Sequence, residues 1–276
     1  MLRNVTVLCV MLCAPFARAD FFEWTDNSIT ALPVGGDFAL ADHTRLTLTY
    51  EHAHASRLGD MFIFVDGSAG YDGELTWYGE IAPRLSLGKV TGKDLSFGPV
   101  TDTLLAFTWE QGEHASALLA GVGFDFKVPR LDYFQVNLYG RSELYGEDAW
   151  FDDAQLTVAT AFPFEVKGER FLLDGYFDFV PGISGPPEFH LNPQLSWDAG
   201  AHWGKPGTFF VGVEIDLWWN KFGVDDGQLV QTGTTSMHPD HPKNGNHPEH
   251  PEHTTPVYSR LDSNQQAVSL LFKAKF

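Results

Sequence analysis

The chain has 276 residues, a formal net charge of −18 and an aromatic content of 14%, with 23 phenylalanines among its residues. Such acidity excludes nucleic acid as a partner, because a phosphate backbone would be repelled. Both cysteines, Cys9 and Cys13, lie near the start of the chain, which excludes a small secreted domain stapled by disulfides.

The first 19 residues have the pattern of a secretory signal peptide. Arg3 supplies positive charge, residues 5–13 form a short apolar core, and Ala17-Arg18-Ala19 is a small-x-small cleavage site. We therefore expect residues 20–276 to form the mature protein, with a net charge of −20 because Arg3 and Arg18 leave with the signal. This acidity fits soluble loops and folding intermediates, and it also fits a mouth that attracts cations.

After the signal, short segments of alternating apolar and polar residues are separated by turn residues. This pattern is typical of strands in a membrane barrel, although a soluble β-sandwich would show it too. The predicted strands are Ser28–Phe38, Asp42–His52, Leu58–Gly67, Leu75–Gly88, Thr101–Glu110, His114–Phe126, Leu131–Tyr145, Asp152–Glu165, Glu169–Val180, Glu188–Trp203, Thr208–Lys221 and Asn264–Phe276. The sequence thus predicts an all-β fold, a transmembrane antiparallel β-barrel of twelve strands with both ends on the periplasmic side.

Parity along each strand predicts which side chains face the lumen, since successive side chains point to opposite faces. In residues 208–221 an apolar row that ends at Trp219 alternates with Glu214 and Asp216, which we expect inside. In residues 188–203 the expected lumen row includes His190 and Asn192.

One predicted strand is apolar on both parities in its middle. In residues 60–66, Phe62 and Phe64 either face the lumen together with Asp60 and Asp66 or face lipid. A charge in hydrocarbon is costly unless it lies beyond the apolar band. The parity of the two aspartates therefore favours the lumen.

The longest predicted external loop, at about residues 223–263, has an unusual composition. Imidazole and carboxylate groups are good ligands for Zn²⁺, Ni²⁺ or Cu²⁺. The segment is also of low complexity and carries no fixed ligand geometry, so weak divalent metal binding and a tolerant surface loop both fit it. The five histidines concerned are His238, His241, His247, His250 and His253.

The last predicted strand alternates between an apolar and a more polar face and ends in an aromatic residue. Leu270, Phe272, Ala274 and Phe276 share the apolar face. This pattern is similar to the C-terminal signal that the outer-membrane barrel assembly machinery recognises.

Two segments resemble a known family. Residues 79–87, GEIAPRLSL, and residues 94–99, DLSFGP, are similar to the most recognisable stretch of the nucleoside-specific channel-forming outer-membrane proteins, the Tsx/OmpK-like family. Weaker likeness extends over most of the mature chain. The resemblance implies a monomeric twelve-stranded barrel in the outer membrane of a Gram-negative bacterium, with a narrow channel along which nucleosides pass aromatic and ionisable residues.

A nucleoside has a flat π-face and a sugar rich in hydroxyl groups, so a selective pore needs aromatic platforms beside carboxylate, amide or guanidinium groups. Alternatively, Glu80 and Arg84 form an ion pair that braces the wall. The candidate lumen residues are Phe62, Phe64, Asp66, Tyr78, Glu80, Arg84, Tyr139, Arg141, Asp174, Tyr176 and Asp178.

These observations favour a passive channel for nucleosides or similar small solutes, in contact with outer-membrane lipid and without a cofactor. One alternative is a surface-binding protein that takes up metal through the histidine loop or serves as a receptor for phage or another ligand. Another is a lipid-modifying barrel enzyme using His54 and Ser56, which we expect in a periplasmic turn. Because no third orienting group is evident, we expect no enzymatic activity.

Overall fold

The computed structural model describes residues 21–33, 38–40, 45–70, 73–113, 115–144, 151–183, 185–237 and 253–276. The predicted signal peptide, residues 1–19, lies outside these ranges. Within them, no helix is long and apolar enough to cross a membrane.

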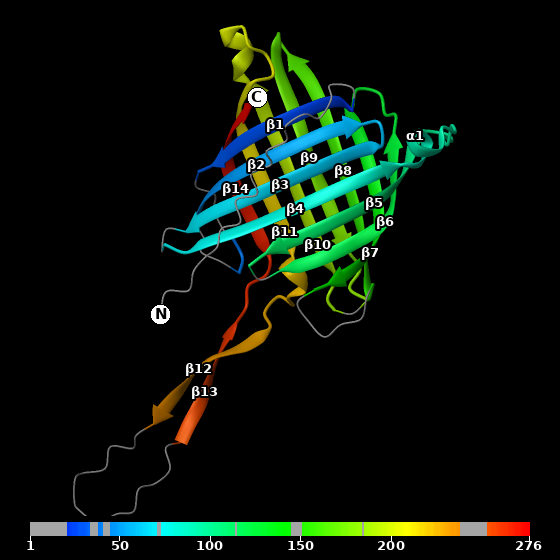
Figure 1. The fold of residues 1–276 in the computed structure, drawn as a ribbon. Coiled ribbons are helices and arrows are strands. Elements are labelled where there is room, and N and C mark those ends of the chain that lie inside the picture. The colour runs from blue at the N-terminus through cyan, green and yellow to red at the C-terminus, as the bar shows by residue number, and fades with distance from the viewer. Residues whose placement is uncertain are drawn as a thin grey trace, which may run out of the picture.

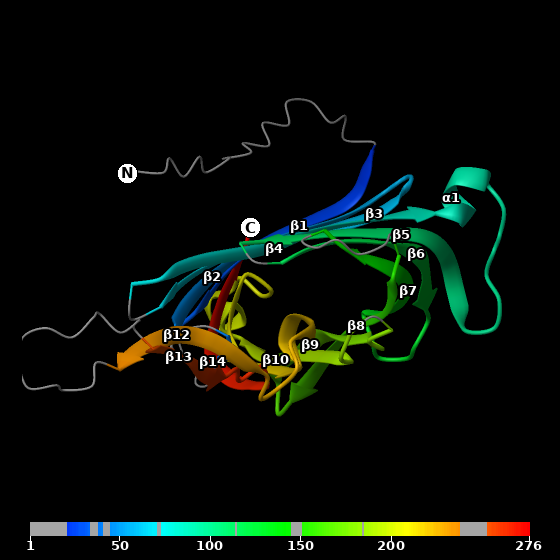
Figure 2. The same cartoon turned by 90° about the horizontal axis from the view of Figure 1, so that it is seen from below.

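Twelve strands form a closed antiparallel barrel (Figures 1 and 2). The order around the barrel is β1-β14-β11-β10-β9-β8-β7-β6-β5-β4-β3-β2, and β12 and β13 form a separate two-stranded sheet. The barrel strands are β1 (Phe22–Leu32), β2 (Arg45–Ser56), β3 (Gly59–Gly70), β4 (Leu75–Ser86), β5 (Val100–Gly112), β6 (Ser116–Phe126), β7 (Tyr133–Glu143), β8 (Asp153–Val166), β9 (Glu169–Val180), β10 (Glu188–Asp198), β11 (Phe209–Trp219) and β14 (Gln265–Lys275). The predicted class and the number of barrel strands are therefore confirmed.

The first two strands were predicted at the wrong boundaries. β1 begins at Phe22 and ends just before Pro33, which cannot donate a ladder hydrogen bond. β2 continues to Ser56, so His54 and Ser56, predicted to lie in a turn, belong to this strand. The aromatic start of β1 and the two histidines of β2 obscured the alternation on which the prediction depended.

Two predicted strands end earlier than expected because a polar side chain caps a short helix. The Ser86 hydroxyl accepts a hydrogen bond from the Lys89 amide, and α1 (Leu87–Thr91) follows. Asp198 accepts from the Ala201 amide in the same way, and the 3₁₀ helix η1 (Ala199–Trp203) follows.

The predicted external loop contains regular structure that the sequence did not indicate. After the 3₁₀ turn η2 (Lys221–Gly223), strands β12 (Leu229–Met237) and β13 (His253–Arg260) pair into a hairpin. Figure 1 shows this hairpin projecting from one end of the barrel, whereas α1 lies at the opposite end. Threonine and serine occupy much of β12, so no apolar alternation marks it.

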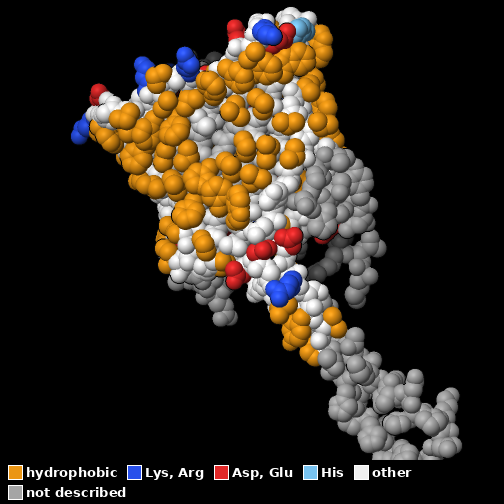
Figure 3. Space-filling model, turned by 180° about the vertical axis from the view of Figure 1, so that it is seen from behind, with side chains coloured by type: hydrophobic (Ala, Val, Ile, Leu, Met, Phe, Trp, Pro, Cys, Tyr) orange, Lys and Arg blue, Asp and Glu red, His pale blue; other side chains and the backbone are white. Residues whose placement is uncertain are grey.

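The outer surface of the barrel is apolar, as Figure 3 shows on one face, with charged side chains gathered at its ends. β14 illustrates the cause: Val268 and Leu270 are exposed, whereas Ala267 and Leu271 are buried. The predicted apolar face of this strand therefore points outward. Such a band is what a barrel needs to lie in hydrocarbon.

The barrel closes where β1 meets β14. Ser28, Ile29, Thr30 and Ala31 are the residues of β1 in register with β14, whereas ten residues of β1 are in register with β2. The Phe276 amide adds a hydrogen bond to the Asn27 carbonyl oxygen. The last strand thus pairs with the first, and this seam is short.

Candidate functional site in the barrel lumen

The strand that sequence parity left ambiguous has its polar side chains in the lumen. Thr49 on β2 lies opposite Asp66 on β3, and its hydroxyl donates to the Asp66 carboxylate at 2.6 Å. Phe64 is in register with Glu51, whose carboxylate contacts Lys273 on β14 at 3.1 Å, on the inner side of β1. Residues in register share a face, so Phe62 and Phe64 also face the lumen.

Aromatic rings form a continuous chain inside the barrel, beginning on β3 and β4. The ring centroids of Phe62 and Phe64 lie 5.9 Å apart, and those of Phe64 and Tyr78 lie 5.9 Å apart. The Tyr78 hydroxyl donates to Glu80 at 2.9 Å, which places a carboxylate beside the rings.

The chain continues on β9, β10 and β11. Trp218 stacks on His190 at 3.6 Å with an interplanar angle of 18°, and His190 meets the edge of Tyr176 at 5.0 Å. Phe222 in η2 joins the two halves, because its ring lies 6.3 Å from Tyr78 and 5.3 Å from Trp218. We call these rings the aromatic arc: Phe62, Phe64, Tyr78, Phe222, Trp218, His190 and Tyr176.

Carboxylate groups lie beside the rings of the aromatic arc. Asp216 accepts from His190 at 2.8 Å and from the Gln265 amide at 2.6 Å. Asp178 on β9 accepts from the Thr157 hydroxyl and lies in register with His190. Acceptors next to flat π-surfaces can bind a solute that carries both a planar ring and hydroxyl donors.

Lys221 supplies a cation at the end of the barrel that carries the hairpin. Its ammonium group donates to Gln265 Oε1 at 2.7 Å and lies over the Trp218 ring, 5.1 Å from the centroid. Burial is the main reason that the pKa of Lys221 is lowered to about 8. Arg45 also lowers this pKa, whereas Asp216 and Glu188 raise it. This lysine therefore changes charge in mildly alkaline solution.

Two arginines brace the wall instead of lining the arc. Arg84 binds both oxygens of Asp60, at 2.8 and 2.6 Å, and also reaches Asp125 at 2.8 Å. The alternative that Glu80 and Arg84 form an ion pair is therefore wrong. Arg84 binds carboxylates on β3 and β6, whereas Glu80 accepts from Tyr78.

Arg141 makes a second network, which also includes contacts to its own strand. It forms two hydrogen bonds of 2.8 Å with Glu110 and further bonds with Glu143 and Gln155. Tyr139 packs with the buried residues Ala106 and Leu119 against β5 and β6. Arg141 and Tyr139 both face the lumen, but neither is one of the rings that form the arc.

Asp174 faces the lumen at another point of the wall. It is in register with Gln194, which bonds to Glu214 at 2.8 Å and to Lys273 at 3.0 Å. Every candidate lumen residue therefore lies on an inward-facing row, but the arc unites only Phe62, Phe64, Tyr78 and Tyr176 directly. Parity placed His190 in the lumen, but sequence reasoning did not select it as a site residue. It also did not select Trp218, which has the parity of Asp216, or Phe222.

Within the described ranges, no group of three or more histidine, cysteine, aspartate or glutamate residues is arranged to hold a metal ion. His238, His241, His247 and His250 lie outside those ranges, and His253 is described only as the first residue of β13. The metal prediction therefore stays a prediction.

His54 and Ser56 do not form the pair that an enzyme would need. Both lie on β2, not in a turn. His54 bonds to His52 at 2.9 Å on the outer face, whereas the Ser56 hydroxyl donates to the Gly59 carbonyl oxygen at 3.2 Å. The Ser56 hydroxyl thus donates to the backbone and not to the His54 imidazole.

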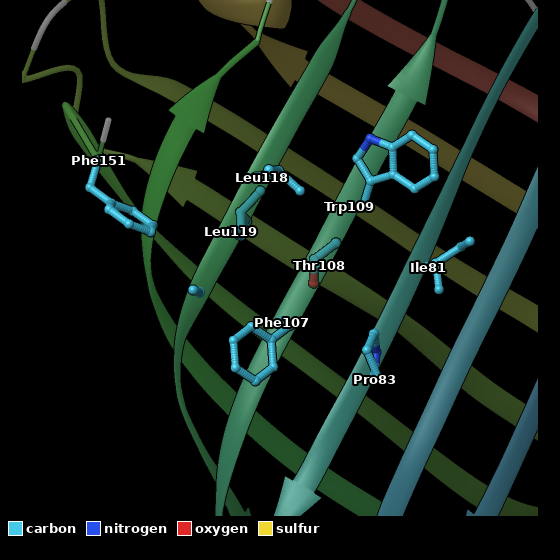
Figure 4. Close-up of a pocket in the computed structure, with 9 residues that line it drawn as sticks. Ile81, Pro83, Phe107, Thr108, Trp109, Leu118, Leu119 and Phe151 are labelled. Atoms are coloured by element: carbon cyan, nitrogen blue, oxygen red, sulfur yellow. The ribbon is translucent and has the colours of Figure 1, made fainter. Parts of the chain in front are cut away.

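An apolar recess lies on the outer surface across β4, β5 and β6 (Figure 4). Ile81, Pro83, Phe107, Trp109 and Phe151 are among its lining residues. Because it belongs to the apolar outer face, it does not suit a polar solute.

A closed barrel with an apolar exterior and a lumen lined by carboxylates, amides and aromatic rings defines the class of membrane channel barrels. A family model described as nucleoside-specific channel-forming protein, Tsx, matches residues 48–241. The chain belongs to this family and is an outer-membrane channel protein, as the sequence predicted.

Two relatives named outer membrane protein OmpK agree with this assignment. One, from Vibrio parahaemolyticus serotype O3:K6 (strain RIMD 2210633), is 26% identical over 202 residues, which cover 67% of this chain and 74% of that protein. The other, from Vibrio parahaemolyticus, is 31% identical over 190 residues, which cover 65% of this chain and 71% of that protein.

Proposed function

We propose that this channel selects nucleosides. The observation that carries the proposal is the aromatic arc with its neighbouring carboxylates, because a nucleobase stacks on aromatic rings while the sugar hydroxyls donate to Glu80, Asp178 and Asp216. Each base–aromatic stack contributes about 1–3 kcal/mol, which suffices for transient binding and permits release.

Single-channel recording in planar bilayers tests this proposal. Adenosine or thymidine is expected to interrupt the ion current of the purified protein in a concentration-dependent manner, whereas ribose has a much weaker effect. Uptake of labelled adenosine into proteoliposomes is expected to fall when unlabelled thymidine competes. Equal interruption by adenosine and ribose, together with uptake that no nucleoside inhibits, would rule out nucleoside selectivity.

We also propose weak divalent metal binding by the histidine-rich segment. Met237 and His253 form the last pair of the hairpin, and residues 238–252 connect them in the sequence. Replacing residues 238–252 by a short glycine–serine link is expected to abolish Zn²⁺ binding in isothermal titration calorimetry and to leave adenosine uptake unchanged. Unaltered Zn²⁺ binding would refute this proposal and leave the channel proposal intact.

A further inference from the structure

The outer face of β1 and β2 carries polar side chains near the end of the barrel opposite the hairpin. Glu51 on β2 faces the lumen, so the alternate residues His52 and His54 face outward. Asn27 on β1 is in register with His52 and shares its face. All three side chains are partly exposed. The surface that faces lipid thus contains a polar cluster, which we define as Asn27, Tyr50, His52 and His54.

On other strands the same end of the outer face carries aromatic rings. The Phe164 ring stacks on Phe162 and on Phe171, with 5.4 Å between the centroids of each pair. His52 lies four residues before the end of β2, just as Phe162 lies four residues before the end of β8. Aromatic belts of this kind lie at the level of the lipid headgroups. The polar cluster therefore takes the place of aromatic residues at headgroup level.

Hydrogen bonds within the cluster determine the tautomer of each histidine. Asn27 Oδ1 can only accept, so it receives hydrogen bonds from His52 Nδ1 at 2.9 Å and from the Tyr50 hydroxyl at 3.0 Å. A neutral imidazole carries one N–H, so His52 Nε2 is an acceptor. His54 Nδ1 donates to this atom at 2.9 Å. The second ring nitrogen of His54, Nε2, consequently keeps its lone pair.

Two polar groups of the cluster are open at its opposite ends. In the described part of the chain, nothing hydrogen-bonds to His54 Nε2 or to the side-chain NH₂ group of Asn27. His54 Nε2 is an acceptor, whereas the Asn27 group offers two donors. A complementary ligand therefore carries both an N–H or O–H donor and an acceptor. Because the neutral cluster has no net charge, a zwitterion suits it better than an anion.

The surroundings of the cluster are apolar on one side and polar on the other. Toward the middle of the barrel, the exposed outer side chains are Ile29, Leu48 and Val65. At the end of the barrel, the Lys89 ammonium group binds the Glu23 carboxylate at 2.8 Å. A molecule that binds here thus meets polar groups at one end and apolar side chains at the other, which is the polarity of a phospholipid.

We propose that the polar cluster binds a phospholipid whose headgroup ammonium carries N–H, as in phosphatidylethanolamine. The ammonium group donates to His54 Nε2, the phosphate accepts from the Asn27 NH₂ group, and the acyl chains lie along Ile29 and Leu48. A choline headgroup has no N–H and cannot donate to His54. The loss of one such hydrogen bond is expected to weaken binding by about fivefold. This inference does not depend on which solute the channel carries.

Native mass spectrometry of the purified wild-type protein at pH 7.5 tests the headgroup requirement. The probes are phosphatidylethanolamine, its N,N-dimethyl derivative, phosphatidylcholine and phosphatidylglycerol, all with two oleoyl chains. The first two lipids carry N–H and are expected to be retained about fivefold more than phosphatidylcholine. Equal retention of phosphatidylethanolamine and phosphatidylcholine, or of phosphatidylethanolamine and phosphatidylglycerol, would overturn the inference.

Three variants test the residues. Asn27→Asp keeps the acceptor for His52 but removes the NH₂ donors, and His54→Phe keeps a ring but removes Nε2. The control is Thr160→Val, because Thr160 is an outer polar residue in register with Phe134 on the far wall. The first two variants are expected to lose the preference for phosphatidylethanolamine, and the control to retain it.

Folding of each variant is checked by its heat-dependent mobility in SDS gels, and His54→Phe alone decides if Asn27→Asp does not fold. An unchanged lipid preference in a folded Asn27→Asp or His54→Phe protein would overturn the inference. Adenosine block is expected to be the same in all these proteins, because none of the changed side chains faces the lumen. Failure of the lipid inference therefore leaves the proposed function intact.

Discussion

Ionisable side chains in the lumen have two separate roles. Arg84 and Arg141 are buried and satisfied by several carboxylates, so they fix the wall, whereas the carboxylates beside the aromatic arc can accept from a solute. Sequence parity placed both kinds of residue in the lumen, but it could not tell them apart. The partner of Arg84 depends on the register of β3, β4 and β6, which the alternation does not determine.

Replacing Arg84 by alanine is expected to destabilise the barrel by about 3 kcal/mol, because Asp60 and Asp125 lose their buried counterion. Urea unfolding of the refolded protein in detergent measures the loss. Arg170→Ala is the matched control: Arg170 is half exposed and 3.8 Å from Asp198, so its loss is expected to cost about 1 kcal/mol or less. Equal effects of the two variants would show that the Arg84 network does not brace the wall.

Lys221 gives the channel a pH dependence of known sign. Because its pKa in the folded protein is about 8, below the ordinary lysine value, the lumen loses a positive charge as the pH rises through 8. Wild type is therefore expected to be less cation-selective than Lys221→Gln at pH 7, and the difference is expected to vanish by about pH 9.5. Reversal potentials in a KCl gradient measure both proteins, and a difference that persists at pH 9.5 would contradict the lowered pKa.

At the level of elements, alternation predicted the barrel strands well wherever both faces had distinct chemistry. It failed at β1 and β2, where polar side chains occur on the outer face, and at β12 and β13, which have no apolar face to bury. It also missed Phe222, because its inward position depends on left-handed backbone angles in a turn. No periodic pattern carries that information.

At some positions two neighbouring strands approach so closely that only glycine fits between them. A Cβ added at Gly121 on β6 would overlap the Leu138 carbonyl oxygen on β7, whereas one added at Gly67 on β3 would meet no atom within 4 Å. Gly121→Ala is expected to lower the free energy of unfolding by about 1–3 kcal/mol or more, and Gly67→Ala to leave it nearly unchanged. Urea unfolding checks the pair, and similar midpoints for both variants would contradict the close approach of β6 to β7 at Gly121.

At the level of the whole molecule, the hairpin is an appendage of a complete barrel. Among the described strands, β12 and β13 pair only with each other. The Leu261 amide donates to the Gln228 carbonyl oxygen at the base of the hairpin. Joining Gln228 to Leu261 through two glycines, without residues 229–260, is therefore expected to preserve the barrel. Heat-dependent gel mobility and single-channel conductance are both expected to match wild type, and loss of the heat-dependent shift would show that the hairpin supports the fold.

The seam between β1 and β14 has a consequence for how the chain folds. The two strands that close the ring are separated by almost the entire sequence, so their contacts have the greatest sequence separation in the barrel and the greatest loop-closure entropy. Every other strand pair can form from segments closer in the chain. Until β14 reaches β1, both strands present unpaired edges that invite pairing with other chains. Ring closure is therefore expected to be the slowest step of barrel assembly. Until the ring closes, the chain has to be kept from pairing with other chains.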